Sequence, residues 1–272
     1  MLFDRLDPRP DDLLVFVHVR KTAGTSVLRM FRQALGEDRC RQLPMQAIEG
    51  YATGWRGVHD AWRRRLMLAR DNLREDLKRR LGRPNTSLAT TAWVGGHVRL
   101  GGIAPPGRRV LALTLLREPI DRFTSEFHMI RRGRERYRLG PLADPRKALA
   151  FAEDFPSYVD MVLDRQAELP LNGQCRYFAA QGGFAAAKAA IDERVFLAGV
   201  TERFDDYFDL LGRRLGLGFG PAARENVRAA DQIPPALPAP LRSRLEAALA
   251  DDIALHDHVR AGFAALWDRR AA

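Results

Sequence analysis

The sequence has little lysine and cysteine and no long apolar run. Of its 44 basic residues only 4 are lysine, and only Cys40 and Cys175 are cysteine. Two cysteines so far apart exclude a disulfide framework and favour free thiols. No stretch approaches the roughly 18 consecutive apolar residues of a membrane span, and residues 1–5 show no signal-peptide pattern. We therefore expect a cytoplasmic protein without a transmembrane segment.

The net charge of +10 at pH 7 favours anionic partners. Nucleic acid is one such partner, but the arginines are scattered along the chain, form no dominant basic tail and have few aromatic residues between them. We therefore expect no nucleic acid partner, and keep a non-enzymatic anion- or nucleic-acid-binding protein as an alternative. At 272 residues, 46% of them hydrophobic, the chain can bury a full core.

Residues 13–36 predict a strand, a tight turn and a helix. Residues 13–19 form an apolar, β-branched run typical of a buried strand. From Ser26 onward apolar residues recur at helical spacing, and Gly36 stands where a helix commonly ends. The turn between them carries a lysine, a glycine and hydroxyl side chains. Because free N–H groups and the helix dipole point into such a turn, we expect it to bind a phosphate-like anion.

The rest of the chain alternates apolar strands with helices. Strands are predicted at residues 92–94, 109–116 and 195–200, and helices at 119–132, after Thr201 as cap, and at 241–267. Residues 62–81 and 145–170, the latter broken by Pro156, also read as helical, whereas 37–59 read as loop. This alternation predicts an α/β fold with a parallel sheet flanked by helices, whose ligands bind at the carboxyl ends of the strands.

Two further polar clusters follow predicted strands. His97 lies in a turn after Gly95 and Gly96, and Arg117 follows the strand at 109–116. Eight residues beyond Arg117, Ser125 is predicted on the polar face of the next helix together with Arg122. Guanidinium groups and a hydroxyl suit a dianionic phosphate, so we expect these groups to converge with the Lys21 turn.

The turn resembles the phosphosulfate loop of sulfotransferases that use 3′-phosphoadenosine 5′-phosphosulfate (PAPS). In their carbohydrate branch it reads roughly Phe-Ile-His-Ile-Pro-Lys-Thr-Gly-Gly-Thr-Ser, and here Phe16-Val-His-Val-Arg20-Lys21-Thr22-Ala23-Gly24-Thr25-Ser26. The two departures are Arg20 for proline and Ala23 for the first glycine. Residues 116–127 resemble the family's 3′-phosphate motif, Arg-Asp-Pro-x-x-Arg-x-x-Ser. Segments at 172–176 and 195–204 extend the resemblance along the chain.

The resemblance implies one P-loop-NTPase-like sulfotransferase domain over 1–272. PAPS would be the sulfuryl donor, with its 5′ end held by residues 20–26 and its 3′-phosphate by Arg117 and Ser125. A glycan or other hydroxyl compound would be the acceptor, bound by Arg99 and Arg176 beside the elaborations at 37–91 and 134–176. No metal is expected.

Lys21 and His97 are the expected catalytic residues. Lys21 would stabilise the negative charge that grows on the leaving phosphosulfate oxygen. The Gly-His-Val turn at His97 resembles the catalytic histidine segment of the uronosyl 2-O-sulfotransferase branch, so His97 is the candidate general base. We expect His18 to be structural, inside its strand, and keep Glu49 and Glu75 as reserve bases.

The main enzymatic alternative is a phosphate-loop kinase. Its loop, Gly-x-x-x-x-Gly-Lys-Ser/Thr, places lysine after the last glycine, whereas Lys21 precedes Gly24. No acidic residue that could hold magnesium follows the strand at 109–116, where Arg117 stands instead. Both features argue against a kinase.

Overall fold

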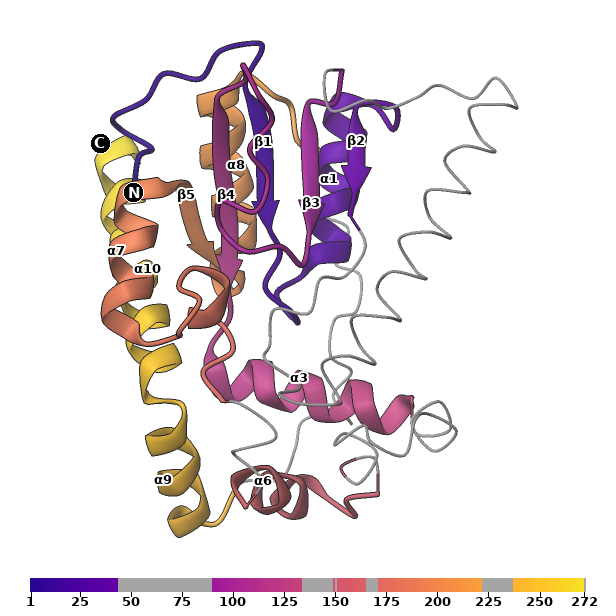
Figure 1. The fold of residues 1–272 in the computed structure, drawn as a ribbon, viewed down its shortest axis with the longest axis vertical. Helices are drawn as coiled ribbons and strands as arrows, with labels where there is room; N and C mark the ends of the chain where they lie inside the picture. Colours follow the sequence, from indigo (N-terminus) through magenta and orange to yellow (C-terminus); the bar gives the residue numbers. More distant parts are fainter. Residues whose placement is uncertain (44–89, 134–148, 150, 165–170, 222–236, 272) are drawn as a thin grey trace.

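A central parallel sheet organises the chain (Figure 1). The computed structural model describes residues 1–43, 90–133, 149, 151–164, 171–221 and 237–271. Five parallel strands lie in the order β2-β3-β1-β4-β5. They are β1 (Leu13–Val17), β2 (Cys40–Gln42), β3 (Trp93–Gly96), β4 (Val110–Leu116) and β5 (Val195–Val200). The predicted α/β fold with a parallel sheet and flanking helices is confirmed.

The strand register places the candidate site at one edge of the sheet. Val17, the last residue of β1, pairs with Gly96 at the end of β3 and with Thr114 near the end of β4. Since all three strands run in the same direction, the chain leaves them at neighbouring points. The turns that begin at His18, His97 and Arg117 therefore share the carboxyl edge.

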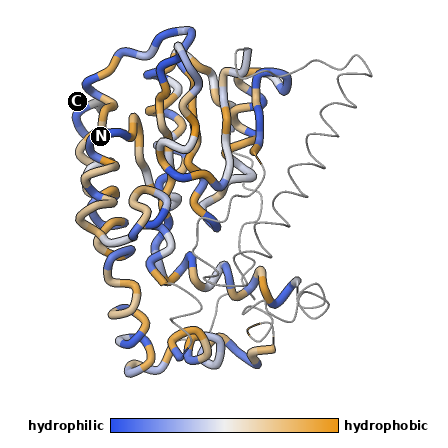
Figure 2. The backbone as a smooth tube through the Cα atoms, viewed as in Figure 1, coloured by the Kyte–Doolittle hydropathy of each residue, from blue (hydrophilic) through white to orange (hydrophobic). Residues whose placement is uncertain are grey.

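Helices cover both faces of the sheet. Leu14 and Phe16 of β1 pack in one hydrophobic cluster with α1 (Gly24–Leu35) and α8 (Phe204–Leu215). Beside β5, the opposite face packs against α7 (Phe184–Arg194) and α10 (Ala250–Ala271). Figure 2 shows the apolar residues concentrated in the strands, with apolar and polar residues alternating along the helices.

A second cluster of helices lies beyond the carboxyl edge. There α3 (Pro119–Arg132) packs with α6 (Phe155–Leu163) and α9 (Ala239–Ala248) around their own buried apolar residues (Figure 1). Its aromatic centre consists of Phe123, Phe127, Phe155 and Tyr158. This cluster fixes α3 beneath the sheet, on the side where the strand ends open.

Several sequence expectations need correction. The first strand ends at Val17, so His18 lies just beyond the strand rather than inside it. The helix expected over 241–267 is two helices, because the chain turns at Leu249 between α9 and α10. Thr201 does not cap a helix: it opens a short 3₁₀ turn, Thr201–Arg203, and α8 begins after it without a side-chain cap.

Other elements differ in extent. β2 lies within the segment read as loop, and α6 lies within the region read as helical, where residues 151–154 before it are not helical. Pro156 stands in the first turn of α6 and does not break it, because that position needs no N–H donor. The expected helix at 62–81 lies outside the described residues.

Both cysteines are free, as the sequence predicted, and both are buried. Among the helices of the described residues, none combines the length and apolar character needed to cross a bilayer.

Candidate functional site

The turn after β1 is held in an unusual backbone conformation. Lys21 and Ala23 both have positive φ angles, 68° and 61°, in the left-handed region. The buried Thr22 hydroxyl donates to the carbonyl of Val19 at 2.8 Å and closes the turn from within. The Thr22 hydroxyl is thus used inside the loop. Ala23 adopts a conformation that glycine enters without steric cost, which explains why glycine suits this position of the resembling motif.

The start of α1 presents free amide groups. Val27 N–H donates to Ala23 O at 3.1 Å. The amides before it, from Lys21 to Ser26, donate to no backbone acceptor among the described residues. The first turn of α1 contains no acidic side chain. Successive N–H groups at a helix N-terminus attract an anion, because they and the helix dipole carry partial positive charge.

His18 and His97 stack directly beside this turn. Their ring centroids lie 4.2 Å apart, at an interplanar angle of 23°. A Cβ atom at Gly24 would clash with the His18 ring, so glycine is required where α1 begins. Burial, with smaller contributions from His97 and the Lys21 and Arg20 cations, lowers the pKa of His18 to about 3. His18 is therefore a neutral ring packed between the turn and His97.

Hydrogen bonding defines which nitrogen of His97 is basic. His97 Nδ1 lies 2.8 Å from the carbonyl oxygen of His18, and the Tyr177 hydroxyl lies 3.4 Å from the same nitrogen. Since a carbonyl only accepts, Nδ1 carries the proton of the neutral ring and Nε2 carries the lone pair. Nε2 bonds to no described residue. Burial lowers the pKa of His97, opposed by the bond to His18, so the neutral form is favoured.

Arg117 connects the end of β4 to the Lys21 turn. Its Nη1 donates to the carbonyl oxygen of Lys21 at 3.4 Å, and its Nη2 lies 3.7 Å from Asp121. The structure therefore brings Lys21 and Arg117 to one place at the carboxyl edge. Their convergence was an expectation from the sequence, and the geometry agrees with it.

Positive charge surrounds Lys21. Burial lowers the pKa of Lys21, and Arg132, Arg20 and Arg117 lower it further, while Glu126 partly opposes them. The Lys21 ammonium forms no ion pair with any described residue. A bound anion would relieve this repulsion and raise the pKa of Lys21 again. The electrostatics thus favour a negatively charged ligand.

The second arginine of the 116–127 motif is not part of the open site. Arg122 was expected on the polar face beside Ser125, but its side chain is buried and pairs with Glu126 at 3.8 Å and Asp252 at 3.9 Å. Ser125 is half-buried on α3, and its hydroxyl bonds to no described residue. Arg20 pairs with Glu126 at 3.7 Å, which links the turn to α3.

Arg99 and Arg176 lie near His97 in the chain fold. Arg99 follows His97 in the turn, where its carbonyl accepts from Gly102 N–H. Arg176 precedes Tyr177, whose carbonyl accepts from Leu100 N–H at 2.8 Å. The two segments are thus tied together beside the stacked histidines. The reserve bases, Glu49 and Glu75, lie outside the described residues.

Gln174 and Glu202 are functional candidates that the sequence reasoning missed. Gln174 forms two hydrogen bonds with the backbone of Arg117, and Glu202 accepts from Glu118 N–H. Both lie in segments noted for their resemblance, 172–176 and 195–204. That signal was present, but it did not indicate that these residues hold Arg117.

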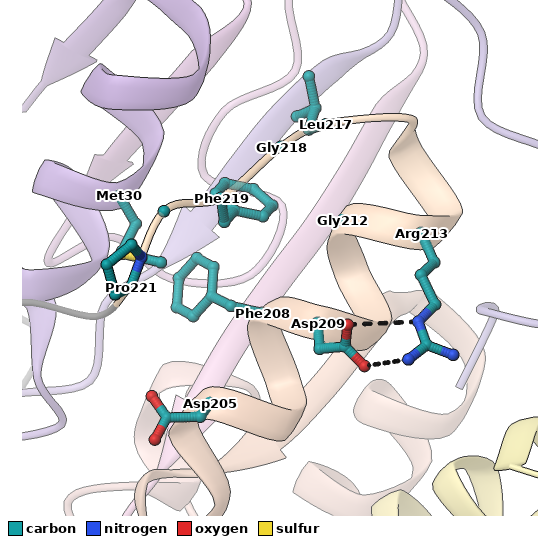
Figure 3. Close-up of a pocket in the computed structure, with 11 residues that line it drawn as sticks. Met30, Asp205, Phe208, Asp209, Gly212, Arg213, Leu217, Gly218, Phe219 and Pro221 are labelled. Atoms are coloured by element: carbon teal, nitrogen blue, oxygen red, sulfur yellow. Dashed lines mark hydrogen bonds and ion pairs between the residues drawn. The ribbon is translucent and has the colours of Figure 1, made fainter.

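A groove on the α1 and α8 side of the sheet does not suit the same ligand (Figure 3). It has a volume of about 640 Å³ and is lined mainly by α8, by the segment at 217–221 and by Met30 of α1. Its charged side chains are Asp205, Asp209 and Arg213, and Asp209 pairs with Arg213 at 2.7 Å. None of the expected site residues lines it, and its carboxylates disfavour phosphate. Within the described part of the chain, no group of three or more His, Cys, Asp or Glu side chains could hold a metal ion.

Comparison with known proteins agrees with this geometry. The model of the sulfotransferase family matches residues 4–205, from the segment before β1 to the start of α8. The chain belongs to the sulfotransferase family. The match includes the Lys21 turn, His97 and the β4–α3 junction. No curated protein matches the chain significantly.

Family membership makes this sulfotransferase-family chain a transferase of sulfuryl groups and implies a sulfonate donor. It favours the expected activity over the kinase and the non-enzymatic alternative. The carbohydrate branch, the donor and the acceptor belong to the proposal below.

Ala23→Gly should leave the free energy of unfolding unchanged or raise it, because glycine adopts φ of 61° without the steric cost of a Cβ atom. The matched control is Ala34→Gly in the last turn of α1, which should lower stability by up to ~1 kcal/mol. Urea unfolding of both variants measures the difference. Equal destabilisation by both would contradict the left-handed conformation of Ala23.

His18 should make the protein acid-sensitive. With a pKa of about 3 in the folded state against 6.5 in the unfolded state, His18 binds a proton only on unfolding between these pH values. Stability is therefore lost as pH falls below 6.5, by ~1.4 kcal/mol per pH unit. His18→Phe keeps a ring against His97 but does not titrate. Between pH 7.5 and 5.5 the parent should lose about 1.4 kcal/mol more than this variant in urea unfolding; parallel losses would disprove the assignment.

Proposed function

We propose that this chain transfers a sulfuryl group from PAPS to a hydroxyl group of a carbohydrate-type acceptor. The observation that carries the proposal is the contact of the Arg117 guanidinium with the Lys21 carbonyl at 3.4 Å. It joins a loop suited to a phosphosulfate with a strand end suited to a second phosphate. A ligand with anionic groups at both ends of one nucleoside fits this pair of positions.

The residues of the turn fit the 5′ end of the donor. The amides between Lys21 and Ser26 and the Lys21 ammonium, which pair with no acceptor in the described part of the chain, would bind its phosphosulfate oxygens. Arg117 and Ser125 would bind the 3′-phosphate. PAPS supplies the activated sulfuryl group. As the bond from sulfur to the bridging oxygen breaks, Lys21 would stabilise the charge on that oxygen without any reorganisation of the turn.

His97 would act as the general base. Its Nε2 lone pair accepts from no residue that the structure describes, its Nδ1–H is fixed on the His18 carbonyl, and its neutral form is favoured by burial. Nε2 would take the proton of the acceptor hydroxyl as the oxygen attacks sulfur. The excess of positive charge near Lys21 supports an anionic acceptor as well as an anionic donor, and Arg99 and Arg176 would bind it. The resemblance of the His97 turn to the uronosyl 2-O-sulfotransferase branch supports a sugar hydroxyl.

Lys21→Ala and Arg117→Ala should each weaken the binding of adenosine 3′,5′-bisphosphate by about 10–100-fold, since each removes a charged hydrogen-bond donor. Isothermal titration calorimetry measures the effect. Lys188→Ala and Arg213→Ala are matched controls, because each side chain forms an ion pair with an aspartate one turn away on its own helix, α7 or α8. If the two site variants bind the nucleotide like the parent, the donor site is wrong. Magnesium-dependent ATP binding would instead favour the kinase.

His97→Ala should retain nucleotide affinity and lose turnover by about 10²–10⁴-fold. A screen of glycans with radiolabelled PAPS identifies an acceptor for this assay. Because burial lowers the pKa of His97 below 6.5, kcat/KM of the parent should stay level near pH 7 and fall only at lower pH. His258→Ala is the matched control, since His258 pairs with Asp192 away from the turn. Full turnover in His97→Ala would assign the base to another residue.

A further inference from the structure

The backbone that presents Arg117 is held by side chains from two distant segments. Arg117 N–H donates to Gln174 Oε1 at 3.1 Å, and Gln174 Nε2 donates to Arg117 O at 3.0 Å. The next amide, Glu118 N–H, donates to Glu202 Oε1 at 2.9 Å. The direction in which Arg117 leaves β4 therefore depends on three hydrogen bonds that the strand does not supply.

Helix α10 in turn contacts both of these residues, Gln174 through its backbone and Glu202 through its side chain. Asp252 Oδ2 accepts from Gln174 N–H at 3.0 Å, and its Oδ1 accepts from Cys175 N–H at 2.9 Å. One turn further along α10, His256 Nε2 lies 3.4 Å from Glu202 Oε2. Asp252 and His256 are both buried and, being four residues apart, lie on the same face of the helix. A single helix face thus contacts both supports of Arg117.

These contacts extend beyond the part of the chain that the family match covers. The match ends at residue 205, whereas α10 begins at Ala250. We propose that Asp252 and His256, acting through Gln174 and Glu202, position Arg117 for the 3′-phosphate of the donor and so make α10 part of the donor site. This proposal rests on the proposed function, which assigns the 3′-phosphate to Arg117.

The physical reason is the geometry of phosphate binding. A guanidinium binds phosphate strongly only when its planar donors are aligned with the oxygens. Side chains that fix a binding residue from behind hold that alignment, and small misplacements cost affinity. Gln174 is fully buried and is bonded through its backbone N–H and both side-chain polar atoms, so it leaves the Arg117 peptide little freedom.

The test compares two nucleotides that differ only in the 3′-phosphate. Calorimetry gives the affinities for adenosine 3′,5′-bisphosphate and adenosine 5′-monophosphate, and their ratio reports recognition of the 3′-phosphate. We expect a roughly 5–10-fold weaker affinity for the bisphosphate and an unchanged affinity for the monophosphate in each of three variants, Glu202→Ala, His256→Ala and Gln174→Ala. In the Arg117→Ala background the same substitutions should change neither affinity, because the residue that they position is absent.

Matched controls come from α10 and from the segment that follows Gln174. His258→Ala removes a histidine from α10 that pairs with Asp192, and Asp251→Asn alters a carboxylate that accepts from Phe184 N–H. Gln181→Ala removes an exposed glutamine near Gln174. All three should keep the parent ratio. Thermal midpoints confirm folding, and Glu202→Ala carries the test in any case, because the Glu202 side chain is 40% exposed at the surface.

The outcomes distinguish a failure of the positioning role of α10 from a failure of the proposed function, which assigns the 3′-phosphate to Arg117. If the tested variants lower the affinities for both nucleotides equally, or lower neither affinity, α10 has no positioning role and the proposal is overturned. If the parent itself does not prefer the bisphosphate, or Arg117→Ala keeps the preference, the assignment of Arg117 fails first. The positioning role is supported if the tested variants lower the ratio of bisphosphate to monophosphate affinity when Arg117 is present, and leave both affinities unchanged in the Arg117→Ala background.

Discussion

The parallel pairing of β1 with β3 on one side and β4 on the other is the constraint on which the site depends. Because the register aligns Val17 with Gly96 and Thr114, the chain leaves all three strands at one edge. His18 N–H then donates to Gly96 O, and the carbonyl of His18 accepts from His97. A shift of one residue in any strand would exchange the faces of its side chains and separate these groups. Sheet register therefore fixes the chemistry.

Positive charge exceeds negative charge around Lys21 at this edge of the sheet. Burial and the neighbouring cations lower the pKa of Lys21, and Glu126 is the one carboxylate among the described residues that opposes them. Glu126 is itself shared between Arg20 and Arg122, at 3.7 and 3.8 Å. One carboxylate thus orders the arginines without neutralising the turn. The lowered pKa values of His18 and His97 keep both rings neutral beside the turn. They therefore add no positive charge, and His97 stays in the form that can accept a proton.

The sequence predicted the elements whose periodicity was strong and missed those without it. β1, β4, β5, α1 and α3 have apolar patterns that the hydrophobic core requires, and the structure agrees. β2 is only three residues long and partly polar, and α7 is rich in alanine, which packs without forming a clear apolar stripe. The turn at Leu249 that divides α9 from α10 follows from packing against α6 and the sheet, which no local pattern records.

The candidate site was predictable in its loops but not in its supports. A lysine in a strand–turn–helix and an arginine after a strand carry local signals. Asp252 and His256 do not, because a polar residue on an amphipathic helix normally indicates solvent, and only the tertiary fold buries them. The prediction for Arg122 was wrong for the same reason. Its position in the helix pattern is typical of a solvent-exposed face, but in the fold Asp252 of α10 lies against it.

Arg117 and Arg122 illustrate how one motif serves two purposes. Arg117 stands before α3, where its guanidinium reaches the Lys21 turn, whereas Arg122 lies one turn into the helix and faces the core.

Burial raises the pKa of Asp252, and Arg122 and the amides of Gln174 and Cys175 oppose that rise. A buried ion pair of this kind is a costly way to gain stability, since desolvation offsets most of its attraction. Its value lies in orientation: the carboxylate that Arg122 accompanies is the one that fixes the Gln174 backbone, and Gln174 fixes Arg117. The buried arginine of the motif thereby supports the half-buried one at the site.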